Sequence, residues 1–298
     1  MKNILIIGCG LLGSSLLRRI QKKKMANKIY IYEKSKSNIA KIKKLKLPGI
    51  ILKKLEDGVI KSDLIILCTP MSEYKNLILK MNKFLSPRTI MTDIGSSKIE
   101  SSKIIKKFLR KDIFWIQSHP IAGSEVSGPE HGKQDIFENK WCVLIKEKNT
   151  KKIHLNVLNK FWKKIGSKVV VMSPEKHDKI FSITSHLPHL IAYNLVKSAQ
   201  DFEKIQNYDL IKYSAGGLRD FSRIAASNEI MWRDIFFNNK QNISRAIDLF
   251  IKNLNSFKKD INSKNNKSIL KKLIQTKKVR SKIIKLKQDI NKPDFGRN

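Results

Sequence analysis

A glycine-rich turn near the N-terminus constrains the fold of this chain more than any other feature. Residues 8–13 read Gly8-Cys9-Gly10-Leu11-Leu12-Gly13, which has the form GxGxxG. An apolar run at residues 3–7 precedes the turn, and residues 11–24 follow it with leucine and isoleucine at helical spacing. A buried strand, a glycine turn and a helix in this order are typical of the first βαβ unit of a dinucleotide-binding sheet.

Each glycine has its own task in such a turn. Gly8 permits the tight turn, Gly10 lets the backbone approach a pyrophosphate at the helix N-terminus, and Gly13 lets helix and strand pack closely. We expect Leu11 and Leu12, which lie between the last two glycines, to belong to the same cofactor site.

Glu33 indicates which dinucleotide binds. It lies twenty residues after Gly13, at the end of a second predicted strand at 28–32. A carboxylate there accepts hydrogen bonds from the adenosine ribose hydroxyls and repels a 2′-phosphate, so we expect NAD in preference to NADP. Lys34 and Lys36 are neighbouring cations that would soften this preference.

Strands and helices alternate through the first part of the chain. Apolar runs predict further strands at 64–68, 89–92, 113–117, 141–145 and 168–172. Helical periodicity lies between them, near 37–46, 72–84, 97–109 and 151–165. This alternation predicts a Rossmann-type, doubly wound and mostly parallel α/β sheet. We expect Thr69 and Pro70, after the third strand, to lie along the cofactor site.

The pattern changes after residue 172. Helical periodicity continues at 177–200, 230–238 and 240–262, and no strand pattern follows. We therefore predict two domains: a NAD-binding domain at 1–172 and an α-helical substrate and dimerisation domain at 173–298 with a basic tail. Residues 291–298 are expected to be disordered.

The charge of the chain is extreme, with a formal net value of +36. Such a charge usually indicates nucleic acid. However, 51 of the 61 basic residues are lysine, and they are spread along the chain with abundant isoleucine and asparagine, as an AT-rich coding sequence would give. Residues 251–298 have a net charge of +12 but lack the interleaved aromatic residues that stack on bases. We expect a solvated or frayed amphipathic helix there, and no nucleic-acid partner.

Composition also indicates the compartment. Apolar residues make up 41% of the chain, yet no run is long enough to span a membrane, and the N-terminal apolar stretch is too short for a signal peptide. Cys9, Cys68 and Cys142 are widely spaced and form neither a zinc-ligand nor a disulfide pattern. We therefore expect a cytoplasmic protein without a membrane partner.

Two polar segments follow predicted strands. The first, residues 93–98, contains Ser96 and Ser97, either of which could cap the next helix, and a cap alone is the alternative to a functional role. The second reads Ser118-His119-Pro120-Ile121-Ala122-Gly123-Ser124-Glu125. Ligands bind beyond the carboxyl ends of strands in open α/β sheets, so His119 is well placed for chemistry. The alternative is a structural histidine at a strand end.

Two more polar segments lie in the predicted helical domain. Residues 185–189 contain His186 and His189, which would share a helix face, but no nearby Asp, Glu or Cys completes a metal site, so none is expected. Residues 216–223 and 231–234 contain Arg219, Arg223 and Arg233, although arginine is scarce in this chain. Arginine grips carboxylates in a planar, bidentate manner, which favours an anionic substrate; Arg–Asp pairing within the helices is the alternative.

Together these motifs resemble those of the prephenate dehydrogenases, the TyrA family. The resemblance runs from Gly8 to about residue 262. It rests on six motifs in this order: the GxGxxG turn, Asp93-x-Gly-Ser96, His119-Pro-Ile-Ala-Gly-Ser-Glu125, Ser185-His-Leu-Pro-His189, Gly217-x-Arg-Asp-Phe-Ser-Arg223 and Met231-Trp-Arg-Asp234. We expect neither a chorismate mutase segment before residue 1 nor an ACT-like domain after residue 262.

The resemblance implies an NAD-dependent enzyme of tyrosine biosynthesis. Hydride would leave C4 of prephenate, CO₂ would leave C1, and the ring would become that of 4-hydroxyphenylpyruvate. Family likeness assigns His119 to the substrate 4-hydroxyl, and Ser96 to the same hydroxyl or to His119. The expected substrate-binding residues, also implied by the resemblance, are Arg223 as carboxylate clamp, His189, Asp220, Ser185 and Trp232. A homodimer is implied as well.

Three alternatives remain at this point. The first is arogenate dehydrogenase or a dual-specificity cyclohexadienyl dehydrogenase, which differs only in the side chain of the substrate. The second is another Rossmann-plus-helical enzyme, such as a β-hydroxyacid dehydrogenase with a catalytic lysine. The third is a nucleic-acid or membrane-surface binding protein attracted by the positive charge.

Overall fold

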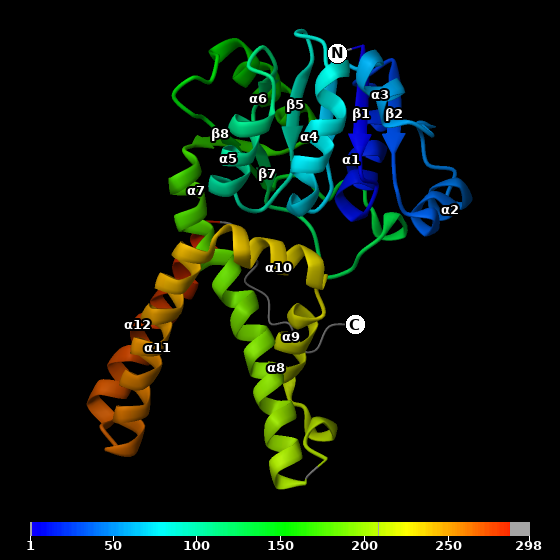
Figure 1. Cartoon of the computed structure of the whole chain (residues 1–298). Helices are drawn as coiled ribbons and strands as arrows, with labels where there is room; N and C mark the ends of the chain where they lie inside the picture. The colour runs from blue at the N-terminus through cyan, green and yellow to red at the C-terminus, as the bar shows by residue number, and fades with distance from the viewer. Residues whose placement is uncertain (1, 208, 287–298) are drawn as a thin grey trace.

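A parallel sheet with helices on both faces forms the upper part of the molecule in Figure 1. The computed structural model describes residues 2–207 and 209–286. Its main sheet has the strand order β3-β2-β1-β4-β5-β6. The six strands are β1 Asn3–Ile7, β2 Lys28–Tyr32, β3 Ile50–Ile51, β4 Leu64–Leu67, β5 Ile90–Asp93 and β6 Phe114–Trp115. Every pairing in this sheet is parallel, which confirms the doubly wound architecture.

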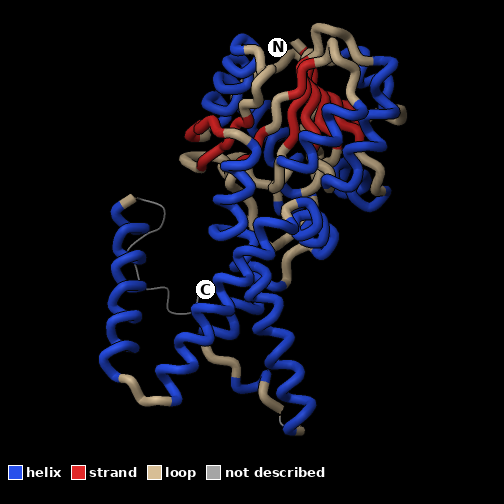
Figure 2. Tube along the Cα trace, turned by 60° about the vertical axis from the view of Figure 1, so that its left-hand side comes forward, coloured by secondary structure: helices blue, strands red, loops and turns tan. Residues whose placement is uncertain are grey.

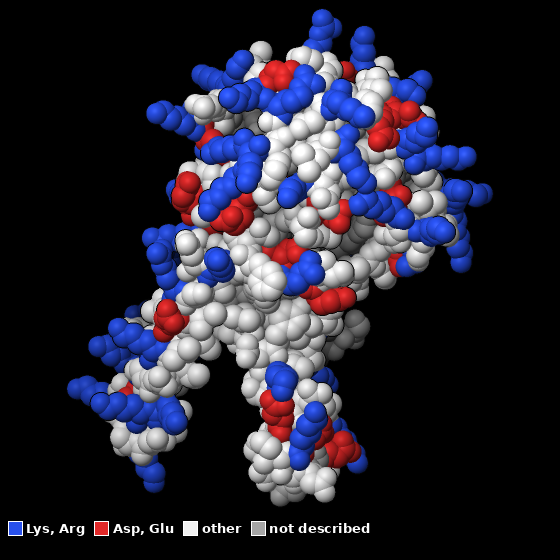
Figure 3. Space-filling model, in the orientation of Figure 1, with Lys and Arg blue, Asp and Glu red and all other residues white. Residues whose placement is uncertain are grey.

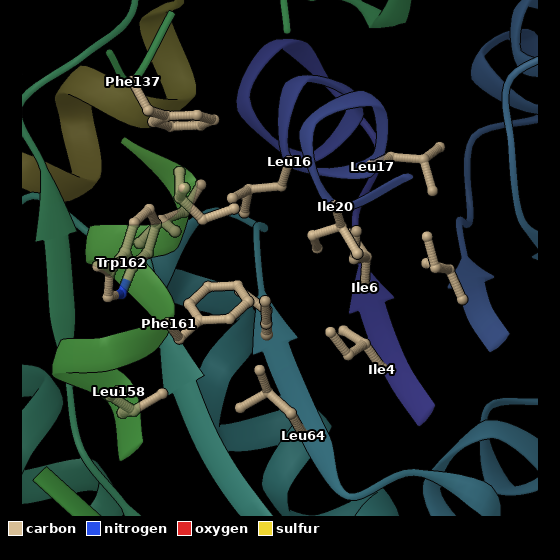
Figure 4. Packing of buried hydrophobic residues seen from close by; sticks show 14 of the residues in the cluster. Ile4, Ile6, Leu16, Leu17, Ile20, Leu64, Phe137, Leu158, Phe161 and Trp162 are labelled. Carbon is tan, nitrogen blue, oxygen red and sulfur yellow. The ribbon is translucent and has the colours of Figure 1, made fainter. Parts of the chain in front are cut away.

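Alternate residues of the central strands build two hydrophobic cores. Ile4 and Ile6 face one side of the sheet, where the packed helices are α1 (Leu11–Lys22) and α6 (Lys152–Ile165). Figure 4 shows this side, with Leu16 and Ile20 of α1 beside the strands and Phe161 and Trp162 of α6. Leu5 and Ile7 face the other side, against α3 (Leu55–Lys61) and α4 (Tyr74–Met81). These strands are apolar on both faces because both faces are covered.

A second sheet holds the segment around His119. It consists of β7 (Ser118–Pro120), β8 (Trp141–Ile145) and β9 (Lys168–Met172). β7 is antiparallel to β8, whereas β9 is parallel to it. The strand expected at 113–117 is present but shorter, as β6, because the chain leaves the main sheet after Trp115 and enters the second sheet at Ser118.

Helices fill the rest of the part of the chain that the structure describes. The remaining α-helices are α2 Lys36–Lys44, α5 Ile99–Phe108, α7 Pro174–Phe181, α8 Leu187–Gln206, α9 Gly216–Ala225, α10 Glu229–Asn238, α11 Lys240–Asn262 and α12 Asn266–Lys285. The helical periodicity expected at 177–200 is confirmed, although a π-helical turn at Ser182–His186 separates α7 from α8. Short 3₁₀ turns include η1 (Met71–Glu73) and η3 (Pro129–His131).

Two helical hairpins extend away from the sheets. One contains α8 and α9 and the other contains α11 and α12, and they diverge in both Figure 1 and Figure 2. α10 lies between the hairpins and the main sheet. Its Trp232 and Ile235 join the hydrophobic core on the sheet face that α3 and α4 cover. Within the basic tail, α12 has no buried residue, as a solvated helix requires. The disorder expected at 291–298 lies outside the described residues.

No helix of the described chain is long and apolar enough to cross a membrane. The predicted boundary at 172/173 falls between the end of β9 and the start of α7. It stays a prediction, because α7 packs back against α5 of the first part.

Candidate active site

The glycine turn leaves space where a pyrophosphate would lie. Gly8 has φ +87° and packs against the backbone of Cys68, and a Cβ added to Gly13 would lie 2.1 Å from the Gly8 carbonyl oxygen. A Cβ added to Gly10 would meet nothing within 4 Å. The first hydrogen bond of α1 runs from Ser14 N to Gly10 O, so the N–H groups of Leu11 and Leu12 emerge at the helix end. The residues present fit a dinucleotide phosphate.

Glu33 reaches back to this turn. Its Oε2 accepts a hydrogen bond from Cys9 N at 2.8 Å, and its Oε1 accepts from Ser35 N at 2.9 Å. Lys34 forms an ion pair with Glu73 at 2.6 Å, so its charge is partly neutralised. The carboxylate is therefore fixed beside the turn, where a ribose would approach it.

Thr69 and Pro70 lie on the other side of the glycine turn. A Cβ on Gly8 would come within 2.9 Å of Thr69 Cγ2. The Thr69 hydroxyl is buried and has no hydrogen-bond partner among the described residues. A buried hydroxyl without a partner is costly, which fits a site that a polar ligand completes. Pro70 immediately precedes η1.

His119 is the start of a buried chain of hydrogen bonds. Its Nδ1 lies 2.8 Å from Nε2 of His177, and Nδ1 of His177 lies 2.7 Å from Oδ1 of Asp178. His177 and Asp178 are fully buried on α7. The Asp178 carboxylate also accepts backbone hydrogen bonds from Lys98 N at 2.8 Å and Ile99 N at 2.9 Å. The second half of the chain thus orients a side chain of the first half.

A buried lysine supports the same strand. Lys98 Nζ donates to Asp93 Oδ2 at 2.7 Å and to the carbonyl oxygen of Ser118 at 2.7 Å. Asp93 also accepts from the Tyr74 hydroxyl at 2.9 Å and from Trp115 Nε1 at 3.2 Å. Each of these polar groups is paired, as burial demands. Lys98 therefore fixes the backbone next to His119.

The surroundings keep the imidazoles neutral. Burial holds the pKa of His119 well below its usual value, and the nearby His177, Lys98 and His186 lower it further. Burial likewise lowers the pKa of His177, with Lys98 and His186 adding to the effect. Burial raises the pKa of Asp178 to about 6, although the N–H groups of Ile99 and Lys98 oppose this shift. A neutral imidazole is a hydrogen-bond acceptor at one ring nitrogen.

The five substrate-binding residues expected on the helical side lie on four helical segments, namely the π turn, α8, α9 and α10. The His189 ring stacks on Trp232 of α10, with centroids 3.8 Å apart, and its Nδ1 bonds to the carbonyl oxygen of Ser185 at 3.0 Å. Burial lowers the pKa of His189. His186 instead has its Nδ1 3.1 Å from Asn239 Nδ2. The described residues contain no group of three or more potential metal ligands.

Arg223 connects α9 to the loop that follows His119. Its Nη1 lies 3.3 Å from Oε1 of Glu125, and its side chain is 46% exposed. The pKa of Glu125 is lowered by a backbone hydrogen bond and by Arg223, against the effect of burial. Asp220 lies one helical turn before Arg223. A half-exposed arginine beside the His119 loop is available to a substrate carboxylate.

Comparison with known proteins agrees with this geometry. The family model "Prephenate dehydrogenase, nucleotide-binding domain" matches residues 16–171, and "Prephenate dehydrogenase, dimerization domain" matches residues 173–276. The chain belongs to the prephenate dehydrogenase family. The doubly wound sheet followed by helices is the fold of this family, and the β-hydroxyacid dehydrogenase alternative is set aside.

Individual relatives of the family cover nearly the whole chain. A cyclohexadienyl dehydrogenase from Zymomonas mobilis is 32% identical over 94% of this chain and 95% of its own length. A prephenate dehydrogenase from Bacillus subtilis is 31% identical over 86% of this chain and 69% of its own length. The crystal structure of prephenate dehydrogenase from Aquifex aeolicus in complex with hydroxyphenyl propionate and NAD+ is 34% identical, with a TM-score of 0.88 and coverage of 95% and 98%.

The expectation that Ser96 or Ser97 caps the next helix is wrong for this member of the prephenate dehydrogenase family. α5 begins later, at Ile99, and its first N–H groups bind the Asp178 carboxylate. The Ser97 hydroxyl donates to the sulfur of Met71 instead. Ser96 is half-buried in the turn after β5. The hydrogen-bond partner of His119 Nδ1 is Nε2 of His177 and not Ser96.

Sequence reasoning missed His177, Asp178 and Asn239. The only local signal is the adjacent His-Asp pair after Ser173-Pro174, in a chain with 25 acidic and 6 histidine residues. Nothing in that pattern states that His177 meets a histidine 58 positions earlier. The Arg–Asp pairing considered as an alternative applies to Arg233, which bonds to Asp234 at 2.7 Å.

Proposed function

We propose that the chain catalyses the NAD+-dependent oxidative decarboxylation of prephenate to 4-hydroxyphenylpyruvate in tyrosine biosynthesis. The observation that carries this proposal is a neutral, buried His119 beside the carboxyl edge of a dinucleotide-binding sheet. Ser118, its neighbour, bonds to the carbonyl oxygen of Asp93 at the end of β5. The names of the relatives point to the same reaction.

His119 has the chemical properties that the reaction needs. Its neutral imidazole accepts a hydrogen bond from the 4-hydroxyl, and electron density builds up at C4 as the hydride departs. Bound NAD+ would accept that hydride. Aromatisation favours loss of CO₂, so the task of this chain is to position the substrate and to polarise one hydroxyl. We assign Ser96 to the same hydroxyl or to His119.

The remaining assignments concern binding. We propose that Arg223 exchanges Glu125 for a substrate carboxylate, and that His189, Ser185, Asp220 and Trp232 shape the rest of the substrate site. The glycine turn, Glu33, Thr69 and Pro70 would hold NAD+, with the pyrophosphate at the start of α1. The space at Gly10 and the unpartnered Thr69 hydroxyl support this placement.

We also propose a homodimer in the cytoplasm. The two helical hairpins expose large apolar side chains, among them Phe202, Ile205 and Leu254, that have no cover within one chain. Patches of this kind usually mark an interface. The three cysteines are all unpaired, which fits a reducing compartment. The absence of a nucleic-acid partner for the basic hairpin stays a prediction.

The test measures NADH formation with prephenate and, in parallel, with arogenate. His119→Asn should lower kcat by about 10²–10⁴-fold while NAD+ binding stays unchanged. Arg223→Ala should instead mainly raise KM for the substrate. Wild-type kcat in the His119 variant, or unchanged KM in the Arg223 variant, would refute the assigned role. Activity with arogenate but not with prephenate would identify arogenate as the substrate.

A further inference from the structure

We propose that His177 and Asp178 are positioning residues that fix the tautomer of His119, so that its Nε2 always presents a lone pair to the substrate hydroxyl. This inference rests on the function proposed for His119. It concerns the direction of every hydrogen bond in the buried chain His119–His177–Asp178.

The direction follows from the donors at the far end of the chain. Backbone N–H groups can only donate, and Lys98 N and Ile99 N occupy one oxygen each of the Asp178 carboxylate. An ionised Asp178 must therefore also accept from His177, so Nδ1 of His177 carries the proton. Nε2 of a neutral His177 is then an acceptor.

The same reasoning gives the proton position on His119. Because Nε2 of His177 accepts, Nδ1 of His119 must donate along the 2.8 Å contact. A neutral imidazole has one N–H, so Nε2 of His119 is left with the lone pair. Burial disfavours a second proton on either ring, which keeps both neutral and the direction unambiguous.

The chain crosses between the two parts of the molecule. Asp178 lies on α7 but caps α5 through two backbone N–H groups. Asn239, at the junction of α10 and α11, donates from Nδ2 to the carbonyl oxygen of Asp178 at 2.8 Å. Docking of the helical part is thus what places the tautomer-setting carboxylate, and His119 lacks a defined tautomer without it.

This arrangement predicts a pH dependence. The titratable groups facing Asp178 are His177 on its own helix, Lys98 at the start of α5 and His186 in the π turn, and the pKa of Asp178 is about 6. Below that pH a protonated Asp178 donates, the chain reverses and Nε2 of His119 carries a proton. We expect kcat to rise with pH through about 6 and then to level off.

The decisive variant is Asp178→Ala. It removes the acceptor of His177 Nδ1, so no group of the chain fixes which nitrogen of His177 carries the proton. We expect kcat to fall by about 10²–10⁴-fold, the limb near pH 6 to disappear, and NAD+ binding to be unchanged, because a wrong histidine tautomer has this size of effect elsewhere. ¹⁵N NMR of the ligand-free enzyme should show Nε2 of His119 change from an unprotonated to a partly protonated nitrogen.

Two further comparisons separate positioning from folding. Asp234→Ala removes another buried carboxylate that crosses to the first part, where it accepts from Ser72 N, but it has no histidine partner. It should leave the His119 resonance unchanged. His177→Gln can accept from His119 through its oxygen and donate to Asp178 through its nitrogen, so it should retain the tautomer, whereas His177→Leu should lose it.

The outcomes are distinct. A fully unprotonated Nε2 in Asp178→Ala, or a kcat equal to that of the wild type, would overturn the inference, as would equal kcat values for His177→Gln and His177→Leu. If the wild-type enzyme does not oxidise prephenate or arogenate, the proposed function fails, while the NMR measurement still reports the tautomer.

Discussion

Single carboxylates determine much of the polar geometry at the residue scale. Acidic residues number 25 against 61 basic ones, and the buried ones hold specific partners. Asp93 binds Lys98, Asp178 binds His177 and the start of α5, and Asp234 binds the start of η1. Glu33 holds the backbone of the glycine turn. In a chain so rich in lysine, a buried carboxylate marks a position where one geometry is required.

Glu33 gives the prediction at this scale. Glu33→Gln removes the negative charge that a ribose would meet and that a 2′-phosphate would avoid. We expect KM for NAD+ to rise by about 10-fold, since a hydrogen bond to a charged group contributes about 1.5–3 kcal/mol, and the preference over NADP+ to narrow. Steady-state kinetics with both cofactors measures the change.

Glu73→Gln is the matched control, because it leaves Glu33 intact and removes the partner of Lys34. It should improve use of NADP+ without raising KM for NAD+. Tighter use of NADP+ than of NAD+ by the wild-type enzyme would contradict the role of Glu33.

At the scale of elements, helix starts of the first part are completed by carboxylates of the second. α5 lacks a side-chain cap of its own and uses Asp178 of α7. η1, ahead of α4, uses Asp234 of α10 through Ser72 N at 2.9 Å. Unpaired N–H groups at helix starts need acceptors, and here the acceptors also bind the two parts to each other. Both elements begin near the carboxyl edge of the sheet, where we propose that NAD+ binds.

Asp234→Ala should therefore destabilise the protein. The change removes a buried acceptor for Ser72 N and the partner of Arg233. We expect the Tm to fall by about 2–4 °C, which corresponds to the ~1 kcal/mol contribution of a typical cap. Thermal unfolding followed by circular dichroism measures this.

Asp248→Ala is a control on α11, where the carboxylate is exposed. Its Tm should equal that of the wild type. Equal Tm values for the two variants would show that the Asp234 cap contributes nothing.

At the scale of the whole molecule, charge and apolar surface are distributed differently. Figure 3 shows Lys and Arg spread over the α/β part and gathered on the α11–α12 hairpin. The apolar side chains exposed on the hairpins include Phe202 and Ile205 of α8 and Leu254 of α11. Apolar burial is insensitive to screening, whereas the repulsion between basic surfaces weakens with salt. A dimer formed through the hairpins should therefore persist at high salt.

Light scattering should give twice the mass of one chain. Ile205→Asp places a charge at a position that is 76% exposed on α8 and should shift the protein toward monomer. Ile60→Asp makes the same change at a position that is 61% exposed on α3, in the α/β part, and should leave the mass unchanged. A monomeric wild-type protein would overturn the dimer.

The sequence by itself determined the features whose signals are local. The glycine turn, Glu33 and the strands at 3–7, 28–32, 141–145 and 168–172 follow from periodicity and spacing over a few residues, and the structure has these strands at the same bounds. His119 and Arg223 stood out through their motifs. The bounds of the short strands were harder to predict, because β3 and β6 have two residues each, too few for a periodic pattern.

Only the tertiary structure decided what surrounds those residues. His119 meets His177 across 58 positions of sequence, and the start of α5 meets Asp178 across about 80. The docking of α7 against α5 sets both contacts, and docking depends on the shapes of packed side chains rather than on any local pattern. The sequence therefore indicates the imidazole that we propose as reactive, whereas the packing of the two parts determines which groups meet its ring nitrogens.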